Sequence, residues 1–133
     1  MDYNSLMANV QKIAAIVWTV DPEGNKRFLL RHNKPFNGYE DEWTVAFGTV
    51  ENNEDLEAAA KREVQEEYDI HEFEEVRNLN YKIENISFFS LKVKNIGVKI
   101  TLNEESIGYD WMLLGKAMEG MKHEDEKKAF DYI

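Results

Sequence analysis

Apolar residues form runs near the start of the chain that predict strands. Residues 12–20 (KIAAIVWTV) are almost all apolar and rich in β-branched side chains, which predicts a strand buried on both faces. The turn sequence DPEGNK separates this run from a second predicted strand over 27–32. We expect a loop over 33–42 and a short strand over 42–48. This part of the chain is therefore predicted to be a set of short strands joined by turns.

The second half of the chain predicts further strands and a closing helix. Strand-like composition occurs over 73–83, 84–95 and 98–104. Apolar residues then recur at helical spacing within 113–133. They begin with Leu114, Ala117, Met118 and Met121. We expect a helix in this region, broken near Gly120.

Between the two groups of strands, residues 48–70 carry eight carboxylates and still have the pattern of a helix. Residues three and four apart share one face of a helix, so three of these carboxylates converge on an edge that we expect to face solvent. They are Glu63, Glu66 and Glu67. The opposite, core-facing stripe consists of Leu56, Ala60 and Val64. A cap for this helix is available from Asp55 or from one of the two preceding asparagines.

The order of strands, helix, strands and helix predicts an α/β (α+β) fold with a mixed β-sheet sandwiched between α-helices. A length of 133 residues suits one domain, spanning 1–133.

Charge and composition narrow the classes of function. The net charge of -10 makes nucleic acid an unlikely partner, since binding to a duplex depends on Lys and Arg placed against phosphates. A small phosphate-bearing partner would then need a bound cation, and Mg²⁺ is the cation that clustered carboxylates and phosphates share most often, with Mn²⁺ as an alternative. The chain has no Cys, no signal peptide and no membrane-length apolar run, so we expect a cytoplasmic protein. For an acidic helix in general, a solvated surface is the usual explanation, and spacing alone does not exclude it here.

The wider pattern of residues 48–70 favours the cation. Five residues separate Gly48 from Glu54, and seven more lead to the run Arg62-Glu63-Val64-Gln65-Glu66-Glu67-Tyr68-Asp69-Ile70. This pattern resembles the Nudix box and matches every defined position except the second Gly, where the chain has Asp69. A residue just past a helix end often adopts the left-handed conformation, which Asp accepts better than most residues other than Gly. Asn53 also stands where many relatives have Gly.

The resemblance implies the Nudix fold and the hydrolysis of a nucleoside diphosphate linked to another group. It implies Glu63 and Glu67 as metal ligands, and Glu66 as a further ligand or a catalytic contact. Arg62 would pair with Glu54 and support the site together with Gly48. An ordinary i to i+4 ion pair with Glu66 is the alternative for Arg62.

A general base often lies outside the box in this family. The stretch NEESIGYDW resembles one in which a Glu precedes a Trp by six residues, which indicates Glu105 relative to Trp111. Glu104 and a plain solvated turn are the alternatives. The following DWMLLGKAMEG resembles dinucleoside polyphosphate hydrolases.

Substrate contacts are predicted from residue type. Aromatic rings stack on any nucleobase, and a cationic side chain can bind phosphate. The main candidates are Arg31, Tyr39, Tyr81 and Phe89, with Phe36, Phe88 and Tyr109 as further aromatic candidates. Packing within the core is the alternative for most of these rings.

The predicted function is thus a metal-dependent pyrophosphohydrolase acting on a small nucleotide, and a homodimer is the expected assembly. A dinucleoside polyphosphate is the favoured substrate. The alternatives are a house-cleaning nucleoside triphosphate pyrophosphatase and a non-catalytic nucleotide-binding module.

Overall fold

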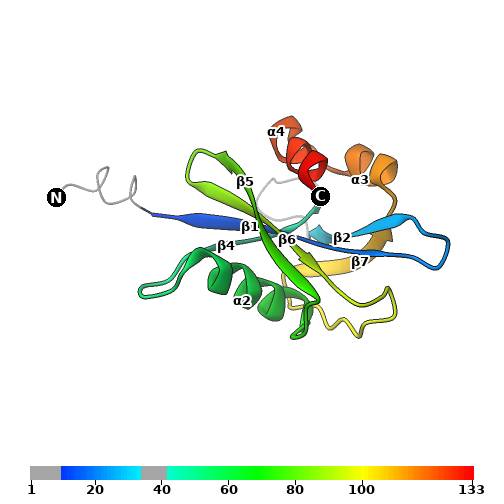
Figure 1. Ribbon diagram of the computed structural model, residues 1–133, viewed down its shortest axis with the longest axis horizontal. Helices are drawn as coiled ribbons and strands as arrows, with labels where there is room; N and C mark the ends of the chain where they lie inside the picture. The colour runs from blue at the N-terminus through cyan, green and yellow to red at the C-terminus, as the bar shows by residue number, and fades with distance from the viewer. Residues whose placement is uncertain (1–9, 34–41) are drawn as a thin grey trace.

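The computed structural model describes residues 10–33 and 42–133. Its strands are β1 (Lys12–Val20), β2 (Lys26–Asn33), β3 (Trp43–Thr44), β4 (Ala46–Thr49), β5 (Glu75–Ile83), β6 (Ile86–Lys92) and β7 (Ser106–Met112). Its helices are α2 (Leu56–Tyr68), α3 (Leu114–Gly120), α4 (Glu124–Lys127) and the short 3-10 helix η1 (Lys128–Tyr132). The sheet is mixed, because β1 and β6 run parallel and the other pairs are antiparallel. Helix α2 covers one face while α3 and α4 lie on the other (Figure 1), so the predicted fold class is confirmed.

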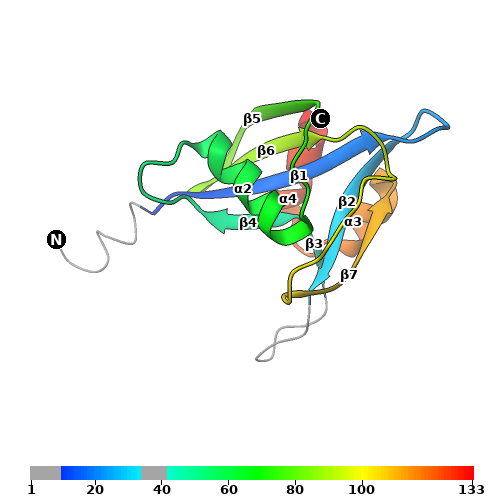
Figure 2. The ribbon, with the colours of Figure 1, turned by 90° about the horizontal axis from the view of Figure 1, so that it is seen from below.

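Strand β1 is central and is buried on both faces, as its apolar run predicts. One edge of β1 pairs with β6, while the other edge pairs first with β4 and then with β2. Strands β1 and β2 diverge beyond the Val17–Leu29 pair, and the segment containing β3 and β4 lies between them. This arrangement packs β4 directly against α2. Figure 2 shows α2 lying across β1 and β4.

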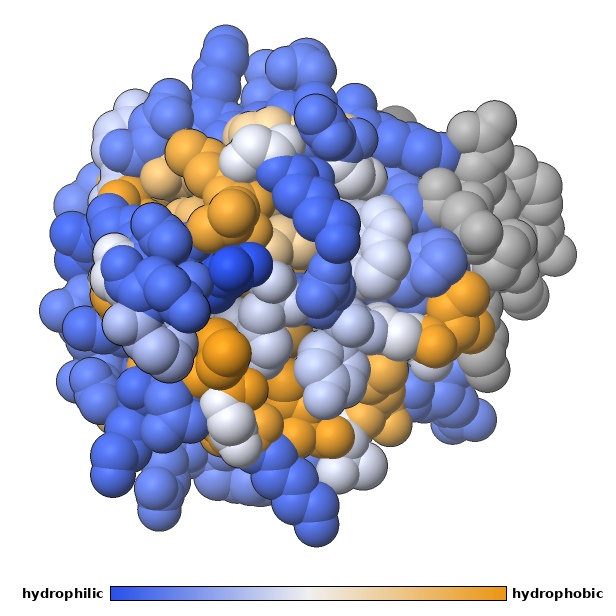
Figure 3. All heavy atoms as spheres, turned by 90° about the vertical axis from the view of Figure 1, so that its right-hand side faces the viewer, coloured by the Kyte–Doolittle hydropathy of each residue, from blue (hydrophilic) through white to orange (hydrophobic). Residues whose placement is uncertain are grey.

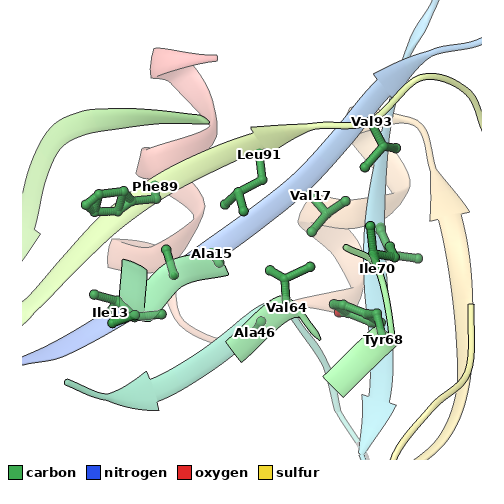
Figure 4. Packing of buried hydrophobic residues seen from close by; sticks show 13 residues of the cluster. Ile13, Ala15, Val17, Ala46, Val64, Tyr68, Ile70, Phe89, Leu91 and Val93 are labelled. Atoms are coloured by element: carbon green, nitrogen blue, oxygen red, sulfur yellow. The ribbon is translucent and has the colours of Figure 1, made fainter. Parts of the chain in front are cut away.

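The two faces of the sheet carry separate apolar cores. One core lies beneath α2 and includes Val64, Tyr68 and Phe89 together with side chains of β1 (Figure 4). The other core lies beneath α3 and η1 and includes Phe28 and Phe130, whose rings meet edge to face. Alternation along each strand assigns its side chains to one core or the other. The layered arrangement follows from this alternation.

The segment over 98–104 is not a strand, so that prediction was wrong. Its apolar side chains do alternate and pack against the core beneath α2, as a strand's would. Its backbone, however, bonds to the end of α2, with Thr101 N–H donating to the Tyr68 carbonyl at 2.9 Å and Asn103 N–H to that of Glu67 at 3.4 Å. The seventh strand instead begins at Ser106 and pairs with β2. The sequence pattern shows little sign of β7, because Ile107 and Tyr109 are exposed and alternate with Gly108 and Asp110, while its buried apolar residue, Met112, lies at its end.

The predicted break in the closing helix is confirmed. Helix α3 ends at Gly120, and α4 begins only at Glu124. A Cβ on Gly120 would lie 3.3 Å from the Cβ of Trp43, so this residue allows α3 to approach β3 closely.

The face of the molecule seen in Figure 3 is largely hydrophilic. The face shown in Figure 3 carries apolar patches set among polar and charged side chains. No helix within the described residues is long and apolar enough to cross a membrane.

Candidate active site

Helix α2 has polar residues at both ends that explain where it begins and ends. The Asp55 carboxylate accepts a hydrogen bond from the Ala58 N–H at 2.7 Å, which makes Asp55 the N-cap. Asp69 caps the other end in the left-handed conformation, with φ of 58°, as the sequence predicts. Asn53, the second residue in place of a glycine, has φ of 65°. Both substitutions therefore retain the backbone conformation that favours Gly, at some steric cost.

The carboxylates of α2 do not share one exposed edge, which corrects the sequence interpretation. The side chains of Glu63 and Glu67 are only 11% and 4% exposed, whereas that of Glu66 is 56% exposed. Glu63 and Glu67 are one turn apart and point inward because α2 packs against β4 through this side. Buried carboxylates need a charged partner, and an arginine pairs with each of them.

Arg62 joins the loop before α2 to the helix. Its Nε and Nη2 donate to the two Glu54 carboxylate oxygens at 2.8 and 3.0 Å, a bidentate contact that confirms the predicted pair. It also donates to Glu63 at 2.8 Å, to both oxygens of Glu66 at 3.3 Å and to the Thr49 carbonyl at 2.9 Å. The alternative pair with Glu66 is thus present as a weaker contact. Arg62 lowers the pKa of Glu54.

Gly48 provides the space that Glu63 occupies. A Cβ built on Gly48 would lie 1.9 Å from Cδ of Glu63, so any side chain there would displace the carboxylate. Burial raises the pKa of Glu63, and the Arg62 guanidinium opposes this effect. The β4 strand and the helix therefore hold the Glu63 carboxylate between a glycine and an arginine.

Glu67 lies deeper and is paired with Arg31 of β2. The Nη2 of Arg31 lies 3.1 Å from Oε1 of Glu67. Burial raises the pKa of Glu67 to about 8, while Arg31 acts in the opposite direction. Oε2 of Glu67 is buried and has no hydrogen-bond partner among the described residues.

Glu105, the predicted base, lies on the turn before β7 and is exposed. Its negative charge raises the pKa of both Glu63 and Glu67, so it lies near enough to act on both carboxylates. Its neighbour Glu104 is also exposed.

Comparison with known proteins identifies the family. The protein-family model described as NUDIX domain matches residues 10–133. The chain belongs to the Nudix family. As a Nudix hydrolase it is an enzyme that acts on pyrophosphate bonds. A search of curated proteins finds no significant match.

Solved structures share the Nudix fold at low sequence identity. A Listeria monocytogenes structure described as a Nudix hydrolase superposes with a TM-score of 0.74 and 18% identity, over 92% of this chain and 90% of that one. The C. elegans Ap4A hydrolase gives 0.71 and 20%, over 92% and 93%. The E. coli dihydroneopterin triphosphate pyrophosphohydrolase gives 0.65 and 20%, over 92% and 96%.

The donor set of this Nudix hydrolase suits a hard cation. Carboxylate oxygens are the ligands that Mg²⁺ and Mn²⁺ prefer, and the unpartnered Oε2 of Glu67 is one such donor. Within 10–33 and 42–133, no three acidic or histidine side chains are already gathered as a ready-made cation site. The arginine contacts of Glu63 and Glu67 account for this, because they direct the two carboxylates toward different partners.

Among the predicted substrate contacts that the structure describes, Arg31 lies at these carboxylates through its ion pair with Glu67, whereas Phe89 and Tyr81 lie elsewhere. Tyr39 and Phe36 lie outside the described residues. Phe89 is 2% exposed and packs in the core beneath α2 (Figure 4), so its ring has no face free for a base and this prediction was wrong. Tyr81 lies on the other face of the sheet, where it stacks on Tyr132 and donates to the Asp125 carbonyl at 2.7 Å.

Two residues at this site were missed by sequence reasoning. Asn33 Oδ1 and Ser106 Oγ lie 2.7 and 3.2 Å from Nη1 of Arg31. Nothing in the sequence connects them, because they are far apart in the chain and meet only through the pairing of β2 with β7.

Proposed function

We propose that this Nudix hydrolase is a metal-dependent pyrophosphohydrolase, using Mg²⁺ or Mn²⁺, that cleaves a nucleoside diphosphate linked to another moiety. The observation that carries the proposal is the pair Glu63 and Glu67, one helical turn apart, nearly buried and each held by an arginine. Carboxylates taken out of water at such a cost are poorly explained as solubilising groups.

The cation would be held by Glu63 and Glu67, with Glu66 as a further ligand or a catalytic contact. When bound, it would neutralise charge on the diphosphate and lower the pKa of a coordinated water. Arg62 would keep Glu63 and Glu66 oriented through its anchor on Glu54.

Glu105 is the proposed general base. Its carboxylate is exposed, so it can accept a proton from the attacking water and release it to solvent. Its electrostatic effect on Glu63 and Glu67 supports a position beside them.

The substrate is proposed to be a small nucleotide, with a dinucleoside polyphosphate preferred. The likeness to the C. elegans Ap4A hydrolase and the sequence DWMLLGKAMEG support this choice. The comparable likeness to a triphosphate pyrophosphohydrolase keeps the nucleoside triphosphates in the test. A cytoplasmic location and a homodimer remain predictions from the sequence.

The test is a hydrolysis screen over dinucleoside polyphosphates, nucleoside triphosphates and nucleotide sugars, with Mg²⁺, with Mn²⁺ and with chelator. Two nucleotides as products support the preferred substrate, whereas one nucleotide plus pyrophosphate supports a triphosphate pyrophosphatase. Turnover that survives chelation contradicts the metal requirement. No turnover by folded protein on any of these compounds contradicts the proposal and favours a non-catalytic binding module.

A further inference from the structure

Arg31 lies in the interior of the protein rather than on a substrate-facing surface. It is 6% exposed and sits on β2, where the strand pairs with Thr44 of β3 on one side and Tyr109 of β7 on the other. Because side chains alternate along a strand, Arg31 shares a face with Leu29, which belongs to the core beneath α2. A cation on this face needs buried partners.

The guanidinium of Arg31 connects three elements. Its Nη1 donates to Oδ1 of Asn33, two residues along the same face of β2, and to Oγ of Ser106 at the start of β7. Its Nη2 forms the ion pair with Oε1 of Glu67 on α2. The two neutral acceptors fix the position of the guanidinium, which in turn fixes one oxygen of the carboxylate.

The contact with Glu67 is one-sided. An arginine and a carboxylate commonly form two parallel contacts, using both oxygens. Here Arg31 contacts Oε1, and the backbone N–H of Phe47 on β4 also acts on the carboxylate and lowers its pKa. Oε2 is buried without a partner at hydrogen-bond geometry among the described residues. Nε of Arg31 is likewise buried without a partner in the part of the chain that the structure describes. A buried carboxylate oxygen in this condition is costly unless something else binds it.

We propose that Arg31 is a positioning residue for Glu67, holding Oε1 so that Oε2 is presented to the divalent cation. This inference rests on the proposed cation site. Arg31 acts through Glu67, and Asn33 and Ser106 act through Arg31. A metal ligand is oriented by the groups that donate a hydrogen bond to it or form an ion pair with it. Loss of such a group typically weakens metal binding by roughly 10- to 100-fold.

The experiment measures Mn²⁺ binding to the substrate-free protein by electron paramagnetic resonance of the free ion. Arg31→Lys keeps the charge but loses the planar fork that reaches three partners. We expect it to weaken Mn²⁺ binding by about tenfold or more, and Ser106→Ala to weaken it by a smaller factor. If circular dichroism shows that Arg31→Lys lowers the yield of folded protein, Ser106→Ala replaces it as the test of the positioning role.

Arg27→Lys is the matched control. Arg27 lies on the same strand and forms its own ion pair, with Asp21 at 2.8 Å, away from α2. The same substitution there should leave Mn²⁺ affinity unchanged. An equal loss in both variants would contradict a specific role for Arg31.

A double-mutant cycle separates positioning from general structural damage. In a Glu67→Gln background, Arg31→Lys should cause no further loss of Mn²⁺ affinity, since its effect passes through the Glu67 carboxylate. Wild-type affinity in Arg31→Lys, or additive losses in the cycle, would overturn the inference and leave the proposed function intact. Failure of the wild type to bind Mn²⁺ would overturn both.

Discussion

Helices α2 and α4 are both acidic, yet they use their carboxylates differently. In α4 the acidic residues Glu124, Asp125 and Glu126 occupy the first turn, where negative charge is favoured by the free backbone N–H groups. The Glu124 side chain is 81% exposed and pairs with Lys127. In α2, Glu66 and Glu67 lie in the last turn, which has no basic residue, so the helix dipole opposes them.

The difference shows that the burial of the carboxylates and their pairing with arginines, rather than their number, distinguish a candidate active site from a solvated helix surface. The acidic residues of α4 satisfy local rules of helix stability. Those in the last turn of α2 violate these rules. Glu67 is stabilised by Arg31 from a distant strand, and Glu63 and Glu66 by Arg62 of the same helix. Such violations of local preference are expected at functional sites.

The largest difference between the carboxylates of α2 and those of α4 is expected in hydrolytic activity. Glu67→Gln removes a proposed cation ligand and should lower kcat/KM by roughly 10³-fold, equivalent to about 4 kcal/mol of transition-state stabilisation. Glu124→Gln should leave kcat/KM unchanged. Steady-state hydrolysis of the substrate found in the screen measures both. Equal activity in Glu67→Gln and wild type would remove Glu67 from the mechanism.

The next largest effect is expected from filling the space that the Glu63 side chain occupies beside Gly48. Gly48→Ala places a Cβ where the Glu63 side chain lies, so it should reduce activity by roughly 10- to 100-fold. Overpacking should also lower the free energy of unfolding by about 1–3 kcal/mol. The control is Gly115→Ala in α3, where a Cβ meets nothing within 4 Å. Urea denaturation and kinetics on both variants test this, and a silent Gly48→Ala would contradict the close contact.

The pH dependence of stability should also separate Glu67 of α2 from Glu124 of α4. The pKa of Glu67 is raised from 4.5 to about 8, so the folded state binds more protons than the unfolded state between these values. Its contribution to stability is therefore complete below the unfolded pKa and is lost as the pH rises toward 8, on the order of a few kcal/mol. Glu67→Gln should reduce the slope in denaturation measured with chelator, and the remaining part comes from Glu63 and Glu126, whose pKa values burial also raises.

Glu124→Gln should keep the wild-type slope over the same range. The pKa of Glu124 is lowered by Lys127, so this carboxylate stays ionised from about pH 5 upward in both states. An undiminished slope in Glu67→Gln would assign it to other groups.

The smallest effect is expected at Asp69, an exposed carboxylate of the same box. Asp69→Gly relieves the left-handed backbone strain but adds freedom to the unfolded chain, for a net gain of roughly 0.5 kcal/mol. Activity should not change. Thermal unfolding and kinetics measure the two effects, and a loss of activity would show that Asp69 has a role in the site.

Most of the fold followed from local patterns. The apolar run of β1, the periodicity of α2 and the break at Gly120 are properties of neighbouring residues, and each was predicted. Strand β7 was missed because Ile107 and Tyr109 are exposed, and Gly108 and Asp110, which alternate with them, add no apolar side chain to the opposite face. The segment 98–104 was mistaken for a strand because its alternating apolar side chains pack against the core although its backbone has no partner strand. Alternation reports burial, whereas strand formation also requires a free edge to pair with.

The sequence by itself determined the family, the carboxylates of the box and the Arg62–Glu54 pair, because their spacing is measured along one helix and the loop before it. Only the tertiary structure decided that Glu63 and Glu67 are buried while Glu66 is exposed, and that Arg31, Asn33 and Ser106 hold Glu67. Helical spacing is a local property of the backbone. Burial and the register between β2 and β7 depend on contacts between distant segments, which local periodicity does not encode.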